Sequence, residues 1–187
     1  MDVLKSVSLV SSANQARAQL AHRFDGRYQP MSPKELAAIL RELAAAIDVS
    51  DVNYILGFPE GGVIPAFAFA QIVDRPSILS TRLALDLPPT ISFEEPHSGL
   101  GTTHYIRGLH EGDHVVVIED EVTTGRTVIN AVRALRRSGV RIDTVGALLA
   151  VDDSGMWQSM SDEQVSLRVR FRLPGEYVAR LRVDAAG

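Results

Sequence analysis

Two carboxylates and a threonine-rich turn follow one another in the second half of the chain. Residues 115–127 read VVVIEDEVTTGRT, so Glu119 and Asp120 come directly after an apolar run and three threonines surround Gly125. Glycine permits a backbone conformation that exposes successive N–H groups, which together with threonine hydroxyls suit a phosphate group. The two carboxylates can accept hydrogen bonds from the vicinal hydroxyls of a sugar. The stretch favours a sugar-phosphate pocket; the alternative is an ordinary strand-to-helix turn with solvated acids.

The neighbouring elements must deliver this stretch to one edge of a sheet. The run 115–118 is β-branched throughout, which is typical of a strand buried on both faces of a parallel sheet. After the turn, apolar residues recur at helical spacing from Val128 to Leu135, and Gly139 ends that helix. Open α/β sheets bind ligands at the carboxyl ends of their strands, and a helix N-terminus attracts phosphate. Both conditions are met between residues 118 and 128.

Further strands and helices alternate along the chain. Strands are predicted over 52–58, 77–81 and 144–151. A helix begins at Ser32, Pro33 and Glu35, which form a capping box with proline in the first turn. This alternation implies βαβ units, so we expect an α/β fold with a central parallel sheet flanked by helices. Residues 82–112 hold three prolines and four glycines, which predicts a long, partly mobile excursion.

Composition limits the class of protein. A length of 187 residues fits one domain, and 45% hydrophobic with 22% charged residues is usual for a globular protein. The absence of cysteine excludes disulfides and zinc-thiolate sites, and a cytoplasmic protein is expected. A net charge of −4 argues against a nucleic-acid partner. No segment approaches the ~20 apolar residues of a membrane span.

Residues 115–127 resemble the signature of type I phosphoribosyltransferases: four apolar residues, two acids, then x-x-Thr-Thr-Gly-x-Thr. The resemblance covers roughly residues 50–155. It implies an enzyme that transfers 5-phosphoribosyl from 5-phosphoribosyl 1-pyrophosphate (PRPP) to a nucleobase or related small-molecule acceptor and releases pyrophosphate. It also implies magnesium held through PRPP and water near Glu119 and Asp120, with no direct protein ligand.

The resemblance assigns roles within the signature. Glu119 and Asp120 would hold the ribose 2′- and 3′-hydroxyls, and we name them as catalytic candidates. The loop that would hold the 5′-phosphate consists of Val122, Thr123, Thr124, Gly125, Arg126 and Thr127. Most of the catalysis would then be positioning and electrostatics rather than covalent chemistry.

Two further segments resemble the pyrophosphate side of the family. Residues 57–63 read GFPEGGV and are similar to its pyrophosphate loop, where Glu60, Gly61 and Gly62 let the backbone approach the leaving group. Arg82 falls where the family tends to place a basic residue, and it could stabilise charge on the pyrophosphate. The alternatives are an ordinary turn and a surface arginine.

Residues 87–110 resemble the family's flexible hood loop, which closes over the substrate and excludes water. Its candidate proton carriers are Glu94, Glu95, His97 and His104, with solvated loop residues as the alternative. The segment 96–98 departs from the adenine-type pattern, and the loop lacks the lysines of orotate-type members. The identity of the acceptor therefore stays open.

On the acceptor side, Trp157 and Asp152 follow the predicted strand 144–151, in the region that borders the nucleobase in the family. The tryptophan could stack on an aromatic acceptor, although tryptophans more often fill a core or an interface.

Residues 1–187 are expected to form one domain, with a core over about 33–155 and a small hood from the N-terminal and C-terminal pieces. We expect a homodimer. Two other functions stay open: an orphan transferase acting on a specialised-metabolite acceptor, and a non-catalytic PRPP-sensing regulator. Such regulators usually carry an added DNA-binding module, which the acidic charge and the weakly patterned first 30 residues disfavour.

Overall fold

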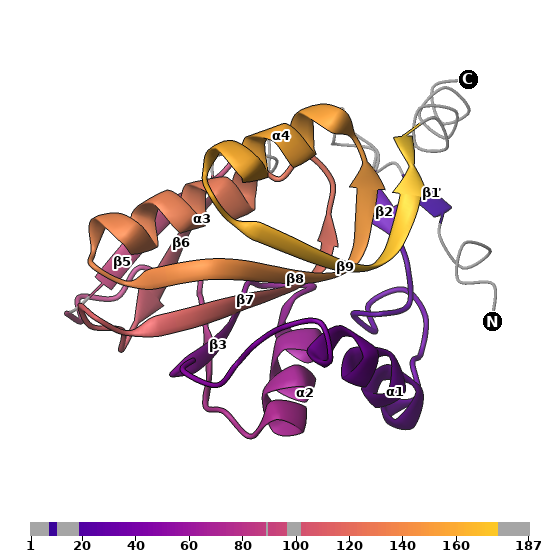
Figure 1. Cartoon of the computed structure of the whole chain (residues 1–187), viewed down its shortest axis with the longest axis horizontal. Coiled ribbons are helices and arrows are strands. Elements are labelled where there is room, and N and C mark those ends of the chain that lie inside the picture. Colours follow the sequence, from indigo (N-terminus) through magenta and orange to yellow (C-terminus); the bar gives the residue numbers. More distant parts are fainter. Residues whose placement is uncertain (1–7, 11–18, 89, 97–101, 176–187) are drawn as a thin grey trace.

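The computed structural model describes residues 8–10, 19–88, 90–96 and 102–175. At its centre lies a sheet of five strands in the order β4-β3-β7-β8-β9 (Figure 1). These strands are β3 (Tyr54–Gly57), β4 (Ser77–Leu79), β7 (His114–Val122), β8 (Arg141–Asp152) and β9 (Ser166–Pro174). Every neighbouring pair runs parallel, which confirms the predicted α/β fold class.

Helices cover both faces of this sheet. They are α1 (Pro33–Ala44), α2 (Val63–Val73), α3 (Arg126–Arg137) and α4 (Ser154–Asp162). Helices α1 and α2 lie against one face, and α3 and α4 against the other (Figure 1). Because parallel strands need crossover connections, α2, α3 and α4 each link one strand of the sheet to the next along the chain.

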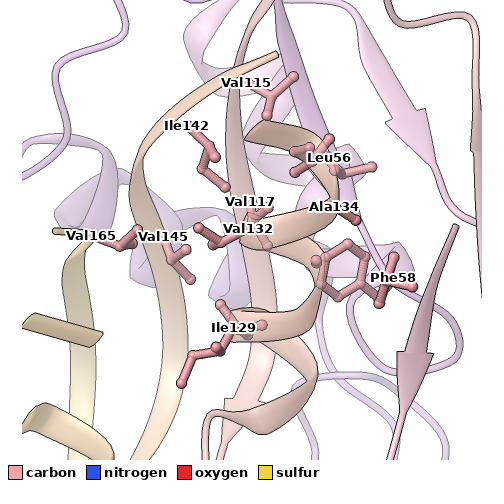
Figure 2. Close-up of a cluster of buried hydrophobic side chains, with 14 of the residues drawn as sticks. Leu56, Phe58, Val115, Val117, Ile129, Val132, Ala134, Ile142, Val145 and Val165 are labelled. Atoms are coloured by element: carbon pink, nitrogen blue, oxygen red, sulfur yellow. The ribbon is translucent and has the colours of Figure 1, made fainter. Parts of the chain in front are cut away.

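Strand β7 shows why the sheet is buried on both sides. Val115 and Val117 face the apolar side chains of α3 (Figure 2), whereas Val116 and Ile118 pack with α1 and α2. Successive side chains of a strand point to opposite faces, so an unbroken β-branched run fills two cores at once. Full burial of each such side chain contributes roughly 1.5–3 kcal/mol.

Two local predictions differ from the structure. Strand β7 continues past the acid pair to Val122, because its pairing with β8 persists to that residue. The predicted capping box is wrong: Ser32 occupies the N-cap of α1 but makes no side-chain cap hydrogen bond. Glu35 instead forms an ion pair with Arg23, with 2.6 Å between Oε2 and Nη2.

An antiparallel ribbon occupies the region where the sequence indicated a mobile excursion over 82–112. The ribbon consists of β5 (Thr90–Glu95) and β6 (Thr102–Arg107). Ile91, Phe93 and Ile106 are buried in the same apolar cluster as α3, so these strands belong to the packed structure. The prediction overlooked this alternation of apolar and polar residues. His97, one of the candidate proton carriers, lies outside the described residues.

The first described residues include a short strand that packs against β8 and β9. Strands β1 (Ser8–Val10) and β2 (Gln19–Ala21) form a small antiparallel pair. Leu20 packs against Leu149, Val151 and Leu173, which fixes β2 to the sheet. The central sheet extends to Pro174, past residue 155 where we expected the core to end. Among the described residues, no helix has the length and hydrophobicity needed to cross a membrane.

Candidate functional site

Strands β3 and β7 lie side by side at the centre of the sheet, but the chain leaves them in opposite directions. From β3 it proceeds to β4 at one edge, and from β7 it proceeds through β8 to β9 at the other. In open α/β sheets, ligands bind at the carboxyl ends of two such strands. The segment Phe58–Gly62, which we call the glycine loop, follows β3, and the acid pair Glu119–Asp120 lies near the carboxyl end of β7. The structure therefore brings these two predicted segments together.

Both members of the acid pair are removed from water. Glu119 is 9% exposed and Asp120 is 4% exposed. The backbone N–H of Phe58 donates a hydrogen bond to Glu119 Oε1 at 3.2 Å. Burial, followed by the charge of Asp120, raises the pKa of Glu119 well above its usual range. The alternative of solvated acids at a strand end is therefore excluded, and a buried pair of this kind suits a ligand that donates hydrogen bonds.

The glycine loop lies directly against the acid pair. A Cβ atom at Gly61 would stand 1.9 Å from Asp120 Oδ2, and one at Gly62 would stand 2.7 Å from Glu119 Oε1. Neither position can therefore hold a side chain without displacing a carboxylate. The peptide bond between Pro59 and Glu60 is cis.

The phosphate loop, residues 123–127, turns from β7 into α3. Gly125 adopts a left-handed conformation (φ 70°) at the N-cap of the helix. A Cβ there would also meet Met160 Cε at 2.9 Å and Met156 Cγ at 3.1 Å, both in α4. The three threonines of the loop are partly buried, Arg126 is exposed, and the Val122 side chain packs into the core. The predicted phosphate residues thus stand at a helix N-terminus next to the acid pair.

Arg82 reaches the glycine loop and the ribbon together. Its Nη2 lies 3.0 Å from Glu95 Oε2, and its Nη1 lies 3.4 Å from Glu60 Oε1. The same Nη2 donates to the Pro59 carbonyl at 3.4 Å. The structure therefore places Arg82 beside the glycine loop rather than free on the surface, and its role toward the pyrophosphate stays a prediction.

Of the two ribbon acids, only Glu95 joins this group. Its carboxylate contacts His104 Nε2 at 3.0 Å, and His104 Nδ1 lies 3.0 Å from Ser80 Oγ. The hydrogen bond from His104, with the charge of Arg82, lowers the pKa of Glu95. Glu94 points to the other side of the ribbon, where Thr103 Oγ1 donates to it at 2.7 Å. Glu94 is therefore not brought to the acid pair.

Trp157 and Asp152 contact each other at the carboxyl end of β8. The indole Nε1 donates to Asp152 Oδ1 at 3.0 Å. The guanidinium of Arg172 lies 4.3 Å from the centre of the indole ring. Among the described contacts, none links either residue to Glu119 or Asp120, so their role toward an acceptor stays a prediction.

Sequence reasoning missed two residues that contact the acid pair. His22 Nε2 lies 3.3 Å from Asp120 Oδ2 and 3.5 Å from Glu121 Oε2. Arg27 Nη2 lies 3.4 Å from the same Asp120 oxygen, and its Nη1 lies 3.8 Å from Glu60 Oε2. Both follow β2 in a segment that matches no motif. The one signal was Glu121, a third consecutive acid whose charge calls for a cation from elsewhere in the chain.

Two possible cation sites lie here. His22, Asp25 and Asp120 each place a ligand atom within 4.8 Å of the others, and all three are buried. Arg27 already contacts both Asp25 and Asp120, so this cluster is an ion-pair network in which a metal would meet a guanidinium. The carboxylate oxygens of Glu119 and Asp120 are of the kind that magnesium prefers, so these two residues could hold a hydrated ion.

Comparison with known proteins places these features in a family. The sequence pattern described as phosphoribosyl transferase matches residues 7–181. The chain belongs to this family. The membership that residues 115–127 predicted is thereby confirmed.

The curated relatives share about a quarter of their aligned residues with this chain. The hypoxanthine/guanine phosphoribosyltransferase of Methanopyrus kandleri is 26% identical over 121 residues, which are 64% of this chain and 64% of that protein. The chain thus spans just under two thirds of the length of that relative. The protein of the same name from Methanocaldococcus infernus is 26% identical over 138 residues, covering 71% of this chain and 73% of that one.

A solved structure shows the same fold. The adenine phosphoribosyltransferase of Giardia lamblia, complexed with 9-deazaadenine, superposes with a TM-score of 0.71 at 17% identity. The superposition covers 92% of this chain and 96% of the Giardia chain, so the arrangement of the whole domain is shared.

Proposed function

We propose that this family member transfers 5-phosphoribosyl from PRPP to a ring nitrogen of a purine-type base and releases pyrophosphate. The observation that carries the proposal is the contact between the glycine loop and the buried acid pair at the centre of the sheet, where Gly61 leaves no room for a Cβ atom. The purine-type acceptor is supported by the names of the relatives, hypoxanthine/guanine and adenine phosphoribosyltransferases.

The ribose 5-phosphate half of PRPP fits the end of β7. Its phosphate would accept hydrogen bonds from the N–H groups and hydroxyls of residues 123–127, at the positive end of α3. Its 2′- and 3′-hydroxyls would donate to Glu119 and Asp120. These hydrogen bonds to buried carboxylates are of the strong, charge-assisted kind, worth about 1.5–3 kcal/mol each.

The pyrophosphate half fits the opposite side. The backbone of Glu60, Gly61 and Gly62 can approach the pyrophosphate closely. The guanidinium of Arg82, which contacts the Pro59 carbonyl, can offset the negative charge of the pyrophosphate. Glu119 and Asp120 would hold magnesium through water, and the ion, when bound, would offset the negative charge of the pyrophosphate. Because Arg82 is already held by Glu95, its guanidinium is oriented before the ligand arrives, and this reduces the entropy lost on binding.

The reaction exchanges one bond for another at the ribose C1 atom. The bond from C1 to the pyrophosphate oxygen breaks, a bond from C1 to the acceptor nitrogen forms, and the proton of that nitrogen passes to water. Positive charge develops on the ribose as pyrophosphate leaves. The carboxylates of Glu119 and Asp120 stabilise that charge without moving, which is the largest contribution that the chain itself makes.

The acceptor side rests on Trp157 and Asp152. We propose that the indole stacks on the acceptor base while Asp152 keeps the ring in place through its hydrogen bond to Nε1. Trp157→Leu should raise the KM for the base and leave the KM for PRPP within about twofold. A parallel rise in both KM values would place the tryptophan outside the acceptor site.

The predicted homodimer has a suitable surface. Large apolar side chains are exposed on α2, at the end of β4 and in the segment after it: Ile64, Phe67, Leu79, Leu83, Leu85 and Leu87. Ile64, Phe67 and Leu79 also line an apolar pocket of about 870 Å³. Protruding leucines and a pocket on one face can complement a second copy of that face. Light scattering tests this proposal: the parent chain should be a dimer and the Phe67→Glu variant a monomer. A monomeric parent chain would contradict it.

The function itself is tested by a pyrophosphate-release assay with PRPP, magnesium and a panel of bases. We expect release with hypoxanthine, guanine or adenine and none with orotate. Release only with a non-nucleobase acceptor would favour the orphan transferase. PRPP binding without turnover on any acceptor would favour the regulator, and absence of PRPP binding would overturn the proposal.

The phosphate loop is tested separately with ribose 5-phosphate. Gly125→Val should abolish its binding, because valine rarely adopts a φ of 70° and its side chain would collide with Met156 and Met160. Circular dichroism checks that the variant is folded. Retained affinity for ribose 5-phosphate in a folded variant would place the phosphate cradle elsewhere.

A further inference from the structure

Glu121 is the third consecutive acid at the end of β7 and has no role in the signature. Its Oε2 atom is buried and has no hydrogen-bond partner among the described residues. Burial raises the pKa of Glu121, and the contact with His22 opposes this rise. A third carboxylate beside a site for a polyanionic ligand is unfavourable unless a cation or a hydrogen-bond donor offsets it.

His22 is that partner, and it comes from a distant part of the chain. The imidazole is fully buried, and its Nε2 lies between Asp120 Oδ2 and Glu121 Oε2 at 3.3 and 3.5 Å. We propose that His22 is a positioning residue: it holds the Oδ2 edge of Asp120 and offsets Glu121, so that Asp120 presents its carboxylate to the ribose. This inference rests on the proposed function, because Asp120 must bind PRPP for its orientation to matter.

The position of His22 is fixed by packing. Phe24 follows it two residues later, is fully buried and stacks on Phe171 of β9 with 5.7 Å between ring centres. The Phe24 backbone N–H donates to His22 Nδ1 at 3.3 Å, and the two rings lie 5.5 Å apart. The segment after β2 is therefore anchored in the core and can hold the imidazole against Asp120.

Charged groups surround the imidazole on several elements. Those that contact it directly or through Asp120 are Asp120 and Glu121 of β7 and Arg27 of the segment after β2, and Asp25 and Glu60 pair with Arg27. Arg27 also contacts Asp120, but no described contact brings it to Glu121. Loss of His22 would therefore remove the cation that contacts Glu121, whereas Asp120 would keep its contact with Arg27.

Steady-state kinetics with four variants test the role. His22→Gln should raise the KM for PRPP by about 10- to 100-fold and change kcat less, because Asp120 and Glu121 would lose the buried cationic partner that lies 3.3 and 3.5 Å from them. Glu121→Gln should change little, and the double variant should recover most of the affinity that His22→Gln loses. The matched control is His114→Gln, which removes a buried histidine between Asp51 and Asp143 at the other end of β7.

Each result decides the question. A KM for PRPP in His22→Gln equal to that in His114→Gln would overturn the inference, as would a double variant no better than His22→Gln. A wild-type chain that binds no PRPP would instead show that the proposed function is wrong, and the inference would fall with it.

If His22→Gln does not fold, a measurement on the wild-type chain replaces it. In ¹⁵N-labelled histidine spectra, PRPP should shift the Nε2 resonance of His22 and leave that of His114 unchanged. An unmoved His22 resonance at saturating PRPP would overturn the inference.

Discussion

A histidine lies between two carboxylates at each end of β7, and the cluster at the carboxyl end is much less exposed than the one at the amino end. At the amino end, His114 Nδ1 lies 3.1 Å from Asp51 Oδ1, and its Nε2 lies 3.4 Å from Asp143 Oδ2. The side chains of both aspartates are more than half exposed, at 60% and 58%. A hydrogen bond from Arg141 lowers the pKa of Asp51. Water and salt screen such pairs, so this cluster needs no ligand.

At the carboxyl end the same residue types face inward. Glu119 and Asp120 are buried, and burial keeps the pKa of Glu119 high. His22 and Arg27 contact Asp120, but neither has a described contact with Glu119. Buried charge lowers stability unless it is well paired, and incomplete pairing of this kind is typical of sites that receive a ligand. Burial, more than residue type, therefore separates an acid cluster that can receive a ligand from a solvated one.

The largest difference should appear when each end loses two carboxylates. Glu119→Gln with Asp120→Asn should reduce the rate of pyrophosphate release by at least about 1,000-fold, because two preorganised charges near the reacting carbon disappear. Asp51→Asn with Asp143→Asn should stay within about twofold. The melting temperature of the first variant should fall, because Asp120→Asn leaves buried His22 and Arg27 with one carboxylate fewer, so circular dichroism must first show that this variant is folded. Similar rates of pyrophosphate release in the two variants would contradict the assignment of the site to the carboxyl end of β7.

A glycine substitution tests whether the position of the acid pair matters, because it displaces a carboxylate without removing it. Gly61→Ala should raise the KM for PRPP by about tenfold or more, since its Cβ would stand 1.9 Å from Asp120 Oδ2. The matched control is Gly155→Ala, whose Cβ would meet only the Asp153 side chain at 3.2 Å. Kinetics of both variants at saturating base provide the measurement. Unchanged KM in Gly61→Ala would mean that the loop does not approach the pair in solution.

The pH dependence of stability tests the charge at the carboxyl end. Burial disfavours the charged form of His22, but its contacts with Asp120 and Glu121 outweigh this and raise its pKa from 6.5 to about 10. The Phe24 N–H at 3.3 Å from Nδ1 also opposes a second proton, but one long neutral contact is weaker than two carboxylates.

Since the folded pKa lies above the unfolded one, the stabilisation by His22 is fully present below pH 6.5. It is lost progressively as the pH rises toward 10. Urea unfolding should therefore show that the wild type has a higher free energy of unfolding than His22→Gln at pH 6.5, and that this difference shrinks as the pH rises toward 10. A constant difference between the two chains would show that His22 is neutral throughout.

The smallest expected effect lies in the ribbon, where two adjacent acids face opposite sides. Glu95→Gln should lower kcat/KM for PRPP by about tenfold, because Glu95 holds Arg82 at 3.0 Å and is itself held by His104. Glu94→Gln should leave it within about twofold, since Glu94 contacts Thr103 on the outer side. Equal losses in both variants would indicate a general effect on the ribbon rather than on Arg82.

Much of the fold was predictable because it depends on local patterns. The β-branched run 115–118 and the helical spacing from Val128 to Leu135 predicted β7 and α3, and both formed. Gly125 and Gly139 adopt the positive φ angles that a turn and a helix end require. The acid pair and the glycine loop meet because parallel strands bring their carboxyl ends to one edge, and strand order alone decides which loops become neighbours.

The remainder depends on contacts between distant residues. His22 reaches Glu121 across about a hundred residues of sequence, and no local pattern marks such a pair. The capping box failed because Arg23 competes for Glu35, a partner that local reasoning does not see. The ribbon was hidden by its prolines and glycines, although Ile91 and Phe93 already showed the alternation of a strand.

The central claim is that the buried carboxyl end of β7 binds PRPP, and calorimetric titration with PRPP and magnesium tests it directly. The wild type and the Asp51→Asn/Asp143→Asn variant should bind one PRPP per chain with the same Kd. The folded Glu119→Gln/Asp120→Asn variant should bind at least about 100-fold more weakly, because two charge-assisted hydrogen bonds are lost. Equal affinity in all three chains would contradict the account.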